Sequence, residues 1–319
     1  MPLRPRPEVE NLQPGFHGGL NQAELKAAGL SPETVLDFSV CANPFAPPAE
    51  VRKILATVPI DRYPDPEATE FREYLAVKLG VAPENIIAGN GAVELIRLTA
   101  LTYFSPGDSV LILEPTFGEY KIASQIVGAS LIYQWGQESD NFTPRIEETV
   151  SLIRQCHPKG VFLCNPNNPT GHYLTREEIE RILDACGDGL LILDEAYIAF
   201  VDQGWSALGL IHRGNVILLR SMTKDYALAG LRLGYAVSNE RIINALRRVC
   251  PPWNVNALAQ KAGVLVLKDS GLLERCQQEI GRAKDFLVGE LGRIGFSLIP
   301  SRTNFFLVKV TSAKDFRSA

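Results

Sequence analysis

Residues 190–197 read LLILDEAY, an apolar run followed at once by two carboxylates and a tyrosine. A run without polar alternation predicts a β-strand that is buried on both faces, as in a parallel sheet covered by helices. Carboxylates at the end of such a strand are costly unless they find partners. Asp194 is therefore either a helix cap or a group that keeps a heteroaromatic ring nitrogen protonated.

Similar apolar runs lie on both sides of this stretch and alternate with helical patterns from about residue 85 to residue 237. This alternation predicts an α/β fold, with a mostly parallel sheet flanked by helices on both faces. A helix expected at Thr175–Ala185 begins with the capping box formed by Thr175 and Glu178. The other expected strands are Ser109–Leu113, Ser130–Trp135, Gly160–Cys164, Val216–Leu219 and Leu233–Val237.

The sequence divides into three predicted parts. Residues 1–43, rich in proline and glycine, predict an irregular N-terminal arm that packs with the small domain. Residues 44–240 contain the alternating pattern and form the large domain, which binds ligands at the ends of its strands. Residues 241–319 predict a small α+β domain with long amphipathic helices and a strand at Asn304–Val310.

The composition is that of a globular protein, with 46% hydrophobic and 21% charged residues. No apolar run approaches the roughly 20 residues of a membrane span, and residues 1–7 lack the apolar stretch of a signal peptide, so we expect a cytoplasmic protein. The net charge of −4 argues against a nucleic-acid partner. Six cysteines form no C-x-x-C pair and four histidines show no ligand spacing, so no metal site is expected.

Two turn motifs are candidates for ligand contacts. Residues 89–94, Gly-Asn-Gly-Ala-Val-Glu, lead into a helical pattern whose free backbone N–H groups would suit a phosphate; a simple turn is the alternative. This motif is neither a dinucleotide fingerprint nor a P-loop, and no G-x-G-x-x-G follows any strand, which argues against a nicotinamide dehydrogenase. Residues 165–171, Asn-Pro-Asn-Asn-Pro-Thr-Gly, predict a turn directly after the strand at 160–164.

The last motif, Ser221-Met222-Thr223-Lys224, follows the strand at Val216–Leu219, and Arg232 comes eight residues after the lysine. A lysine at a sheet end can form an imine once desolvation or nearby cations lower its pKa. Taken alone, a lysine is more often a solvated surface charge. The combination with the other motifs makes Lys224 a candidate nucleophile.

In this order, the four motifs resemble the class I and II aminotransferase family of fold type I pyridoxal-phosphate enzymes. The resemblance extends from His17 to Val310. Each motif is unspecific alone, but Asn-Pro-x-Asn-Pro-Thr-Gly, Asp-Glu-Ala-Tyr and Ser-x-Thr-Lys with an arginine eight residues later are jointly specific. The resemblance implies an enzyme whose cofactor is pyridoxal 5'-phosphate.

The resemblance also implies roles for individual residues. Lys224 carries the cofactor as a Schiff base and moves the proton at the substrate Cα. Asp194 pairs with the pyridinium nitrogen, while Asn168 and Tyr197 hydrogen-bond the 3-hydroxyl oxygen of the cofactor. Phe117 stacks on the pyridine ring, for which ordinary core packing is the alternative. Lys224, Asp194 and Tyr197 are thus the predicted catalytic residues.

The cofactor phosphate is assigned by the resemblance to backbone amides and side chains that are good anion donors. They are Gly91, Ala92, Val93, Ser221, Thr223 and Arg232. Tyr63 matches a tyrosine that reaches the cofactor phosphate of the neighbouring subunit, which implies a homodimer with shared active sites. Without the resemblance, Tyr63-Pro64-Asp65-Pro66 predicts only a turn.

Two subfamilies fit the sequence best. His17-Gly18-Gly19 and Asn43-Pro44 resemble the opening of L-threonine-O-3-phosphate decarboxylase of cobalamin synthesis, as does Thr223-Lys224-x-Tyr226. Ala229-Gly230 is more like histidinol-phosphate aminotransferase of histidine synthesis, and Cys41 stands where the decarboxylase pattern favours asparagine. We expect the decarboxylase, with His17, Gly18, Gly19 and Asn43 on the substrate side. Either substrate is a small phosphorylated amino acid or amine, so a further cationic pocket is expected near the arm.

One part of the family pattern is missing from the sequence. An arginine that clamps the substrate carboxylate, or an equivalent anion, belongs beyond the strand expected at Asn304–Val310. The sequence ends at Ala319, and Arg317 falls outside that motif. The alternatives are a truncated chain, a member that holds its substrate in another way, and a pyridoxal-phosphate-binding protein without turnover, such as a sensor.

Overall fold

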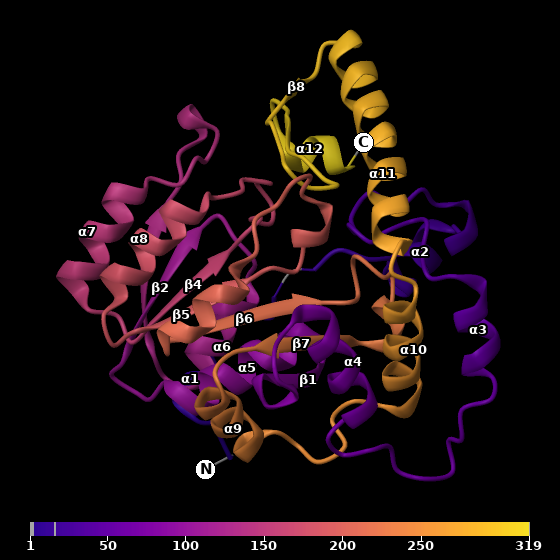
Figure 1. The fold of residues 1–319 in the computed structure, drawn as a ribbon. Helices are drawn as coiled ribbons and strands as arrows, with labels where there is room; N and C mark the ends of the chain where they lie inside the picture. The colour runs from indigo at the N-terminus through magenta and orange to yellow at the C-terminus, as the bar shows by residue number, and fades with distance from the viewer. Residues whose placement is uncertain (1–2, 16, 319) are drawn as a thin grey trace.

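The computed structural model describes residues 3–15 and 17–318 and is built around a seven-stranded sheet. The strand order is β1-β7-β6-β5-β4-β2-β3, and helices lie on both sides of it (Figure 1). The strands are β1 (Ile86–Asn90), β2 (Ser109–Glu114), β3 (Ser130–Trp135), β4 (Gly160–Cys164), β5 (Leu190–Asp194), β6 (Val216–Ser221) and β7 (Leu233–Val237).

The sheet is parallel except at β7, which runs antiparallel to both of its neighbours, β1 and β6. The expected α/β fold with a mostly parallel sheet is therefore confirmed. Strand β1 is absent from the predicted strands, because Gly89 and Asn90 resemble a turn more than a strand. Since β7 runs against its neighbours, its first residue lies at the edge of the sheet where β1, β5 and β6 end.

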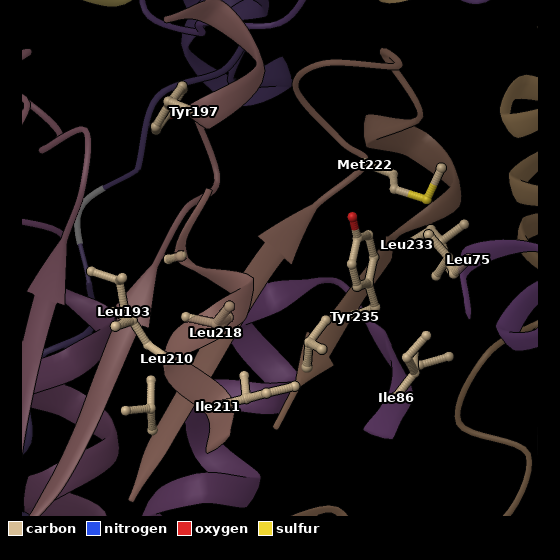
Figure 2. Packing of buried hydrophobic residues seen from close by; sticks show 14 of the residues in the cluster. Leu75, Ile86, Leu193, Tyr197, Leu210, Ile211, Leu218, Met222, Leu233 and Tyr235 are labelled. Atoms are coloured by element: carbon tan, nitrogen blue, oxygen red, sulfur yellow. The ribbon is translucent and has the colours of Figure 1, made fainter. Parts of the chain in front are cut away.

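Two helical layers bury the two faces of the sheet, because successive strand residues point to opposite sides. In β5, Leu191 and Leu193 face one hydrophobic cluster, whereas Leu190 and Ile192 face the other. The first layer, part of which Figure 2 shows around Leu193, contains α3 (Ala49–Leu55), α4 (Thr69–Leu79), α7 (Ile146–Cys156), α8 (Arg176–Cys186) and α10 (Ala257–Lys268). The second layer contains α5 (Ala92–Tyr103), α6 (Glu119–Ile126) and α9 (Glu240–Val249).

The capping box expected before α8 is present, since Thr175 Oγ1 accepts from the Glu178 amide and the Glu178 carboxylate accepts from the Thr175 amide.

Among the described residues, no helix has the length and apolar character that crossing a membrane requires. The same residues contain no group of three or more histidine, cysteine or acidic side chains that could hold a metal ion.

The remaining elements belong to the two ends of the chain. The N-terminal arm contains α1 (Pro7–Glu10) and α2 (Gln22–Ala28), and the C-terminal part contains α11 (Leu272–Arg293), α12 (Ala313–Ser318) and the pair β8 (Ser297–Leu298) and β9 (Val308–Lys309). In Figure 1, α11 extends away from the sheet and carries β8 and α12 beyond it. The domain boundaries at residues 43 and 240 stay a prediction, and α9 and α10 pack on the central sheet.

The strand expected at Asn304–Val310 is much shorter in the structure, where only Val308–Lys309 pairs with another strand. Just before this short strand, side chains form hydrogen bonds with backbone N–H and C=O groups. Ser301 Oγ accepts from the Thr303 amide, and Thr303 Oγ1 donates to the Phe305 carbonyl. Such local bonds from serine and threonine compete with a sheet ladder, which explains the shorter strand.

Candidate active site

The polar motifs follow strands that end at one edge of the sheet. The last residues of β4 and β5 are paired, so the Asn-rich turn at 165–171 begins beside Asp194. Ser221, at the end of β6, pairs with Gly234 in β7, and this pairing brings Arg232 to the same edge. Segments that are spread between residues 165 and 232 of the sequence therefore meet at one place in the fold.

Asp194 is buried, with 2% of its surface exposed, and both carboxylate oxygens have partners. Oδ2 accepts from the Tyr120 hydroxyl over 2.7 Å, and Oδ1 accepts from the Ala196 amide over 2.9 Å. Burial raises the pKa of Asp194 to about 6, and the Tyr120 hydroxyl opposes this rise. Tyr120 is absent from the sequence-based site, because nothing in its local sequence indicates a partner 74 residues away.

Glu195 points to the opposite side of the chain and forms a buried ion pair that sequence reasoning also missed. Its Oε2 lies 2.8 Å from Nη2 and 2.9 Å from Nε of Arg220. Two contacts from one guanidinium make a strong charge-assisted interaction, and removal of either partner would leave an uncompensated buried charge. The pair fastens the end of β5 to the end of β6, and it thereby fixes the strand that carries Asp194 relative to the one that leads to Lys224.

Lys224 is half-buried in the loop that follows β6. Desolvation lowers the pKa of its amine, and Arg232 lowers it further, whereas the Cys41 thiol acts in the opposite direction. A lower pKa leaves more of the amine unprotonated, which is the form that attacks a carbonyl carbon. The structure thus gives Lys224 the environment expected for an imine-forming lysine.

The candidate phosphate donors gather where β1 and β6 end and β7 begins. Gly91 has a φ of +75°, and a Cβ at this position would lie 2.7 Å from Nη2 of Arg232. The hydroxyls of Ser221 and Thr223 are 2.6 Å apart. Ala92 and Val93 are the first two residues of α5, where backbone N–H groups have no partner within the helix. The glycine allows the guanidinium to lie directly against the turn.

Tyr197 is buried near the same strand ends. Its ring packs edge-on against Phe305, with 4.8 Å between ring centroids, and Figure 2 shows it beyond the end of the strand that carries Leu193. Burial raises the pKa of the Tyr197 hydroxyl well above its usual value, and the Cys41 thiol contributes in the same direction. The hydroxyl therefore stays protonated and is available as a hydrogen-bond donor at neutral pH.

The Asn-rich turn uses its two adjacent asparagines differently. Asn167 is engaged within the protein, since its amide nitrogen donates to the Pro115 carbonyl and its oxygen accepts from the Thr116 hydroxyl. Asn168, the predicted cofactor ligand, is half-buried beside it. The turn is therefore tied to the segment that precedes Phe117.

Phe117 lies between the N-terminal arm and α6. Its ring centroid is 5.7 Å from that of Tyr120 and 5.7 Å from that of His17. Nε2 of His17 is 2.9 Å from Oε1 of the buried Glu119, whose second oxygen is 3.1 Å from Arg97. These contacts hold His17 over the predicted ring-stacking residue, and neither Glu119 nor Arg97 was predicted from the sequence.

The other arm residues that were predicted on the substrate side form contacts with the rest of the protein. The Gly19 amide donates to Ser39 Oγ over 2.8 Å, and a Cβ at Gly18 would clash with the Ser39 carbonyl. Asn43 hydrogen-bonds the loop that carries Lys224. The structure therefore brings Asn43 next to the catalytic loop, and it ties Gly18 and Gly19 to a neighbouring stretch of the arm.

Tyr63, a predicted cofactor ligand, has a strongly exposed side chain. Its ring is 75% exposed and stacks on Trp253, with 4.3 Å between ring centroids. Trp253 is itself partly exposed and has a φ of +53°. The pair presents two aromatic rings on the surface of the described chain.

The strand-end carboxylate, the desolvated lysine and the anion donors define a pyridoxal-phosphate-dependent enzyme. Residues 33–319 match the family described as aminotransferase class I and II, and the chain belongs to this family. A histidinol-phosphate aminotransferase from Caldanaerobacter subterraneus subsp. tengcongensis is 40% identical over 279 residues, which are 86% of this chain and 78% of the relative. The expected cofactor, pyridoxal 5'-phosphate, is confirmed by membership of this family.

Solved structures agree with this fold. Histidinol-phosphate aminotransferase from Sinorhizobium meliloti, in complex with pyridoxal-5'-phosphate, has a TM-score of 0.88 at 23% identity, over 99% of this chain and 85% of that one. L-threonine-O-3-phosphate decarboxylase from Porphyromonas gingivalis has a TM-score of 0.76 at 26% identity, over 88% and 83%. The 40% identical relative favours the aminotransferase over the decarboxylase that the arm motifs led us to expect.

Proposed function

We propose that this enzyme is a transaminase that accepts the amino group of histidinol phosphate. The observation that carries the proposal is the meeting of Lys224, Asp194 and Arg232 at one sheet edge, in a chain 40% identical to a protein named for that activity. The resemblance of the arm to the decarboxylase rests on a few short motifs, whereas the identity to the aminotransferase covers 86% of the chain.

The residues of the candidate site match the chemical groups of the cofactor, both its phosphate and its pyridine ring. Arg232, the Ser221 and Thr223 hydroxyls and the amides of Ala92 and Val93 supply donors for a dianion, and the start of α5 adds a favourable helix dipole. Gly91 leaves room for this arrangement, because a Cβ there would lie only 2.7 Å from Nη2 of the Arg232 guanidinium. The donor set is that of a phosphate cradle.

On the ring side, we assign to Asp194 the task of holding the pyridine nitrogen protonated. The bound cofactor then draws electrons from the bond that breaks at the substrate Cα. Tyr197 and Asn168 supply hydrogen bonds at the 3-hydroxyl oxygen, and Phe117 supplies an aromatic face for stacking. The bond from Tyr120 keeps the Asp194 carboxylate in one orientation.

Lys224 is proposed to be the residue that would hold the cofactor covalently through its Nζ. Once the substrate amine had displaced it, the Lys224 amine would take the proton from the substrate Cα and carry it to the cofactor. Desolvation favours the neutral amine that both tasks need. Over a full cycle, the amino group of the substrate passes to a 2-oxo acid, and the substrate leaves as a ketone. No electrons or atoms are gained or lost overall.

The substrate side of the site is proposed to include His17, Gly18 and Gly19. Support comes from His17, whose ring lies 5.7 Å from that of Phe117.

A homodimer with shared sites is likewise proposed, because the exposed pair of Tyr63 and Trp253 supplies aromatic surface of the kind enriched in interfaces.

A product assay with two substrates tests the function. The protein, with cofactor, is incubated with histidinol phosphate and a 2-oxo acid, and separately with O-phosphothreonine. We expect a new amino acid in the first mixture and no CO2 from the second. CO2 release from phosphothreonine would instead support the decarboxylase, and a spectral change with both compounds but no product would support a binding protein without turnover.

A further inference from the structure

The loop that carries Lys224 is held from outside by the N-terminal arm. After β6 the chain turns through residues 222–228 without forming a helix or strand, and Ala227 has a φ of +52°. A loop of this kind cannot satisfy its own carbonyl groups through a regular ladder. The Ala227 amide reaches the Lys224 carbonyl only over a long 3.4 Å.

Asn43 supplies the hydrogen bonds that the loop lacks. Its backbone amide donates to the Lys224 carbonyl over 2.8 Å, and its Nδ2 donates to the Asp225 carbonyl over 2.8 Å. Its Oδ1 accepts from the Phe45 amide over 2.9 Å, which fixes the orientation of the side-chain amide. Asn43 thus hydrogen-bonds the carbonyl groups of two consecutive residues, Lys224 and Asp225, the second of which lies 182 residues later in the sequence.

The burial of Asn43 makes these bonds effective. Only 2% of its surface is exposed, so water cannot readily replace either bond. An adjacent contact secures the same strip of the arm, since Asn304 Nδ2 donates to the Cys41 carbonyl over 2.9 Å. Residues 41–43, called the strap here, therefore connect the segment that contains Phe305 to the lysine loop.

We propose that Asn43 is a positioning residue that holds the backbone of Lys224 and Asp225, so that the lysine amine keeps one location relative to the cofactor ring. The inference rests on the proposed role of Lys224. It gives Asn43 a different task from the substrate contact that the sequence led us to expect, because one N–H and the oxygen of its amide are engaged by the backbone. The strap acts through Lys224 and does not touch the reacting atoms.

Asn43→Ala tests the role against a matched control, Asn239→Ala. Asn239 also uses both ends of its amide on backbone groups, since it accepts from the Ile242 amide over 3.0 Å and donates to the Gly214 carbonyl over 2.9 Å. Its bonds lie at the start of α9 and involve no residue of the lysine loop. Each variant loses two hydrogen bonds between its side-chain amide and the backbone, but only Asn43→Ala releases the Asp225 carbonyl next to Lys224. The bond from the backbone amide of residue 43 to the Lys224 carbonyl remains.

The first readout needs no cofactor. Hydrogen exchange of a peptide covering residues 222–229 is expected to become at least about tenfold faster in Asn43→Ala than in the wild type and to stay unchanged in Asn239→Ala. In the protein with cofactor, the pH midpoint of the cofactor absorbance band is expected to rise in Asn43→Ala, because a looser loop exposes the lysine to water. We expect kcat to fall about tenfold or more, with KM changed far less.

The inference is overturned if Asn43→Ala keeps the exchange rate, the pH midpoint and kcat of the wild type and only melts earlier, as Asn239→Ala does. Should Asn43→Ala not fold, Asn43→Asp replaces it with the same readouts, because a carboxylate still accepts from Phe45 but cannot donate to Asp225. Borohydride reduction of the wild type separates the two proposals. Cofactor found on another residue would refute the role of Lys224, whereas cofactor on Lys224 with an unchanged Asn43→Ala protein would refute only the strap.

Discussion

The hydroxyl of Tyr120 donates to Oδ2 of Asp194 over 2.7 Å, and neither side chain is in contact with bulk water. Tyr120 is itself immobilised, since its ring stacks on Phe162 with 4.9 Å between centroids. The carboxylate therefore keeps a fixed direction at the end of β5 even though burial raises its pKa. A rigid acidic group is what a ring nitrogen needs if it is to stay protonated through a reaction cycle.

Asp194→Asn is expected to bind the cofactor and to lose kcat by about a hundredfold or more, because the neutral amide no longer stabilises a positive ring nitrogen. Steady-state kinetics and the absorbance of the bound cofactor measure the two effects separately. Tyr120→Phe leaves the carboxylate in place without its hydrogen bond and should show a smaller loss. Turnover of the Asn variant at the wild-type rate would refute the role of Asp194.

Asp194→Asn should also change how the stability of the cofactor-free protein depends on pH. The pKa of Asp194 rises from 3.8 to about 6 on folding, so the folded state holds this proton more tightly than the unfolded chain. The resulting stability is fully present below about pH 4 and is lost as the pH rises through 6. Asp194→Asn removes this titration, so the variant should be more stable than the wild type at pH 7.5, by roughly 1 to 3 kcal/mol.

Urea unfolding of both cofactor-free proteins at pH 5 and pH 7.5 checks this prediction. The stability difference between them should be clearly larger at the higher pH. An equal difference at the two pH values would mean that Asp194 does not titrate between them.

Lys224→Ala should abolish the covalent bond to the cofactor and lower turnover by about a thousandfold or more, because the nucleophile and the proton carrier are lost together. Absorbance spectra and the product assay are the measurements. Lys53→Ala, which removes an exposed lysine of α3, serves as the control and should match the wild type. An intact cofactor absorbance with normal turnover in Lys224→Ala would contradict the mechanism.

Gly91→Ala should weaken cofactor binding about tenfold to a hundredfold, since the new methyl group would lie 2.7 Å from Nη2 of Arg232 and displace the guanidinium. The control is Gly80→Ala, because Gly80 has a similar φ of +69° but has nothing within 4 Å of an added Cβ. The backbone strain differs between the two variants, because Gly80 (φ 69°, ψ 35°) lies in the left-handed helical region, whereas Gly91 (φ 75°, ψ 165°) lies in a region that essentially only glycine adopts. Thermal melting of both variants therefore accompanies the binding measurement. Equilibrium titration with the cofactor would reveal equal affinities if Gly91 had no part in the phosphate cradle.

Mixing two inactive variants tests the proposed homodimer. If Tyr63 serves the neighbouring subunit, a hybrid of Lys224→Ala and Tyr63→Ala has one site with both residues intact and one site with neither. Half of the dimers in an equal mixture are hybrids, so about a quarter of the wild-type activity should return after subunit exchange. No recovery, although mass spectrometry detects hybrid dimers, would show that Tyr63 does not act across subunits.

The apolar runs were sufficient to predict most of the sheet, because strands buried on both faces need continuous hydrophobic residues. They could not reveal that β7 runs antiparallel, since burial says nothing about strand direction. β1 was missed because its last two residues, Gly89 and Asn90, have low strand propensity and are held in the sheet by pairing with β7.

The site was predictable to the extent that its residues lie at the ends of strands. Asp194 and Ser221 are of this kind, and strand order alone brings them together. Tyr120 and Arg220 were not predicted as partners of the site, and Asn43 was predicted as a substrate contact and not as a partner of the Lys224 loop, because each acts through a contact with a residue far away in the sequence. Such contacts depend on tertiary packing and leave no local pattern.

The position of β7 has a consequence for how the enzyme is made. This strand is the last of the large sheet to be synthesised, yet it lies in the interior of the sheet, between β1 and β6. A nascent chain that stops short of Val237 has two unpaired strand edges and lacks Arg232 in its final location. The donors assigned to the cofactor phosphate are therefore brought together only when this last-synthesised strand is inserted between β1 and β6.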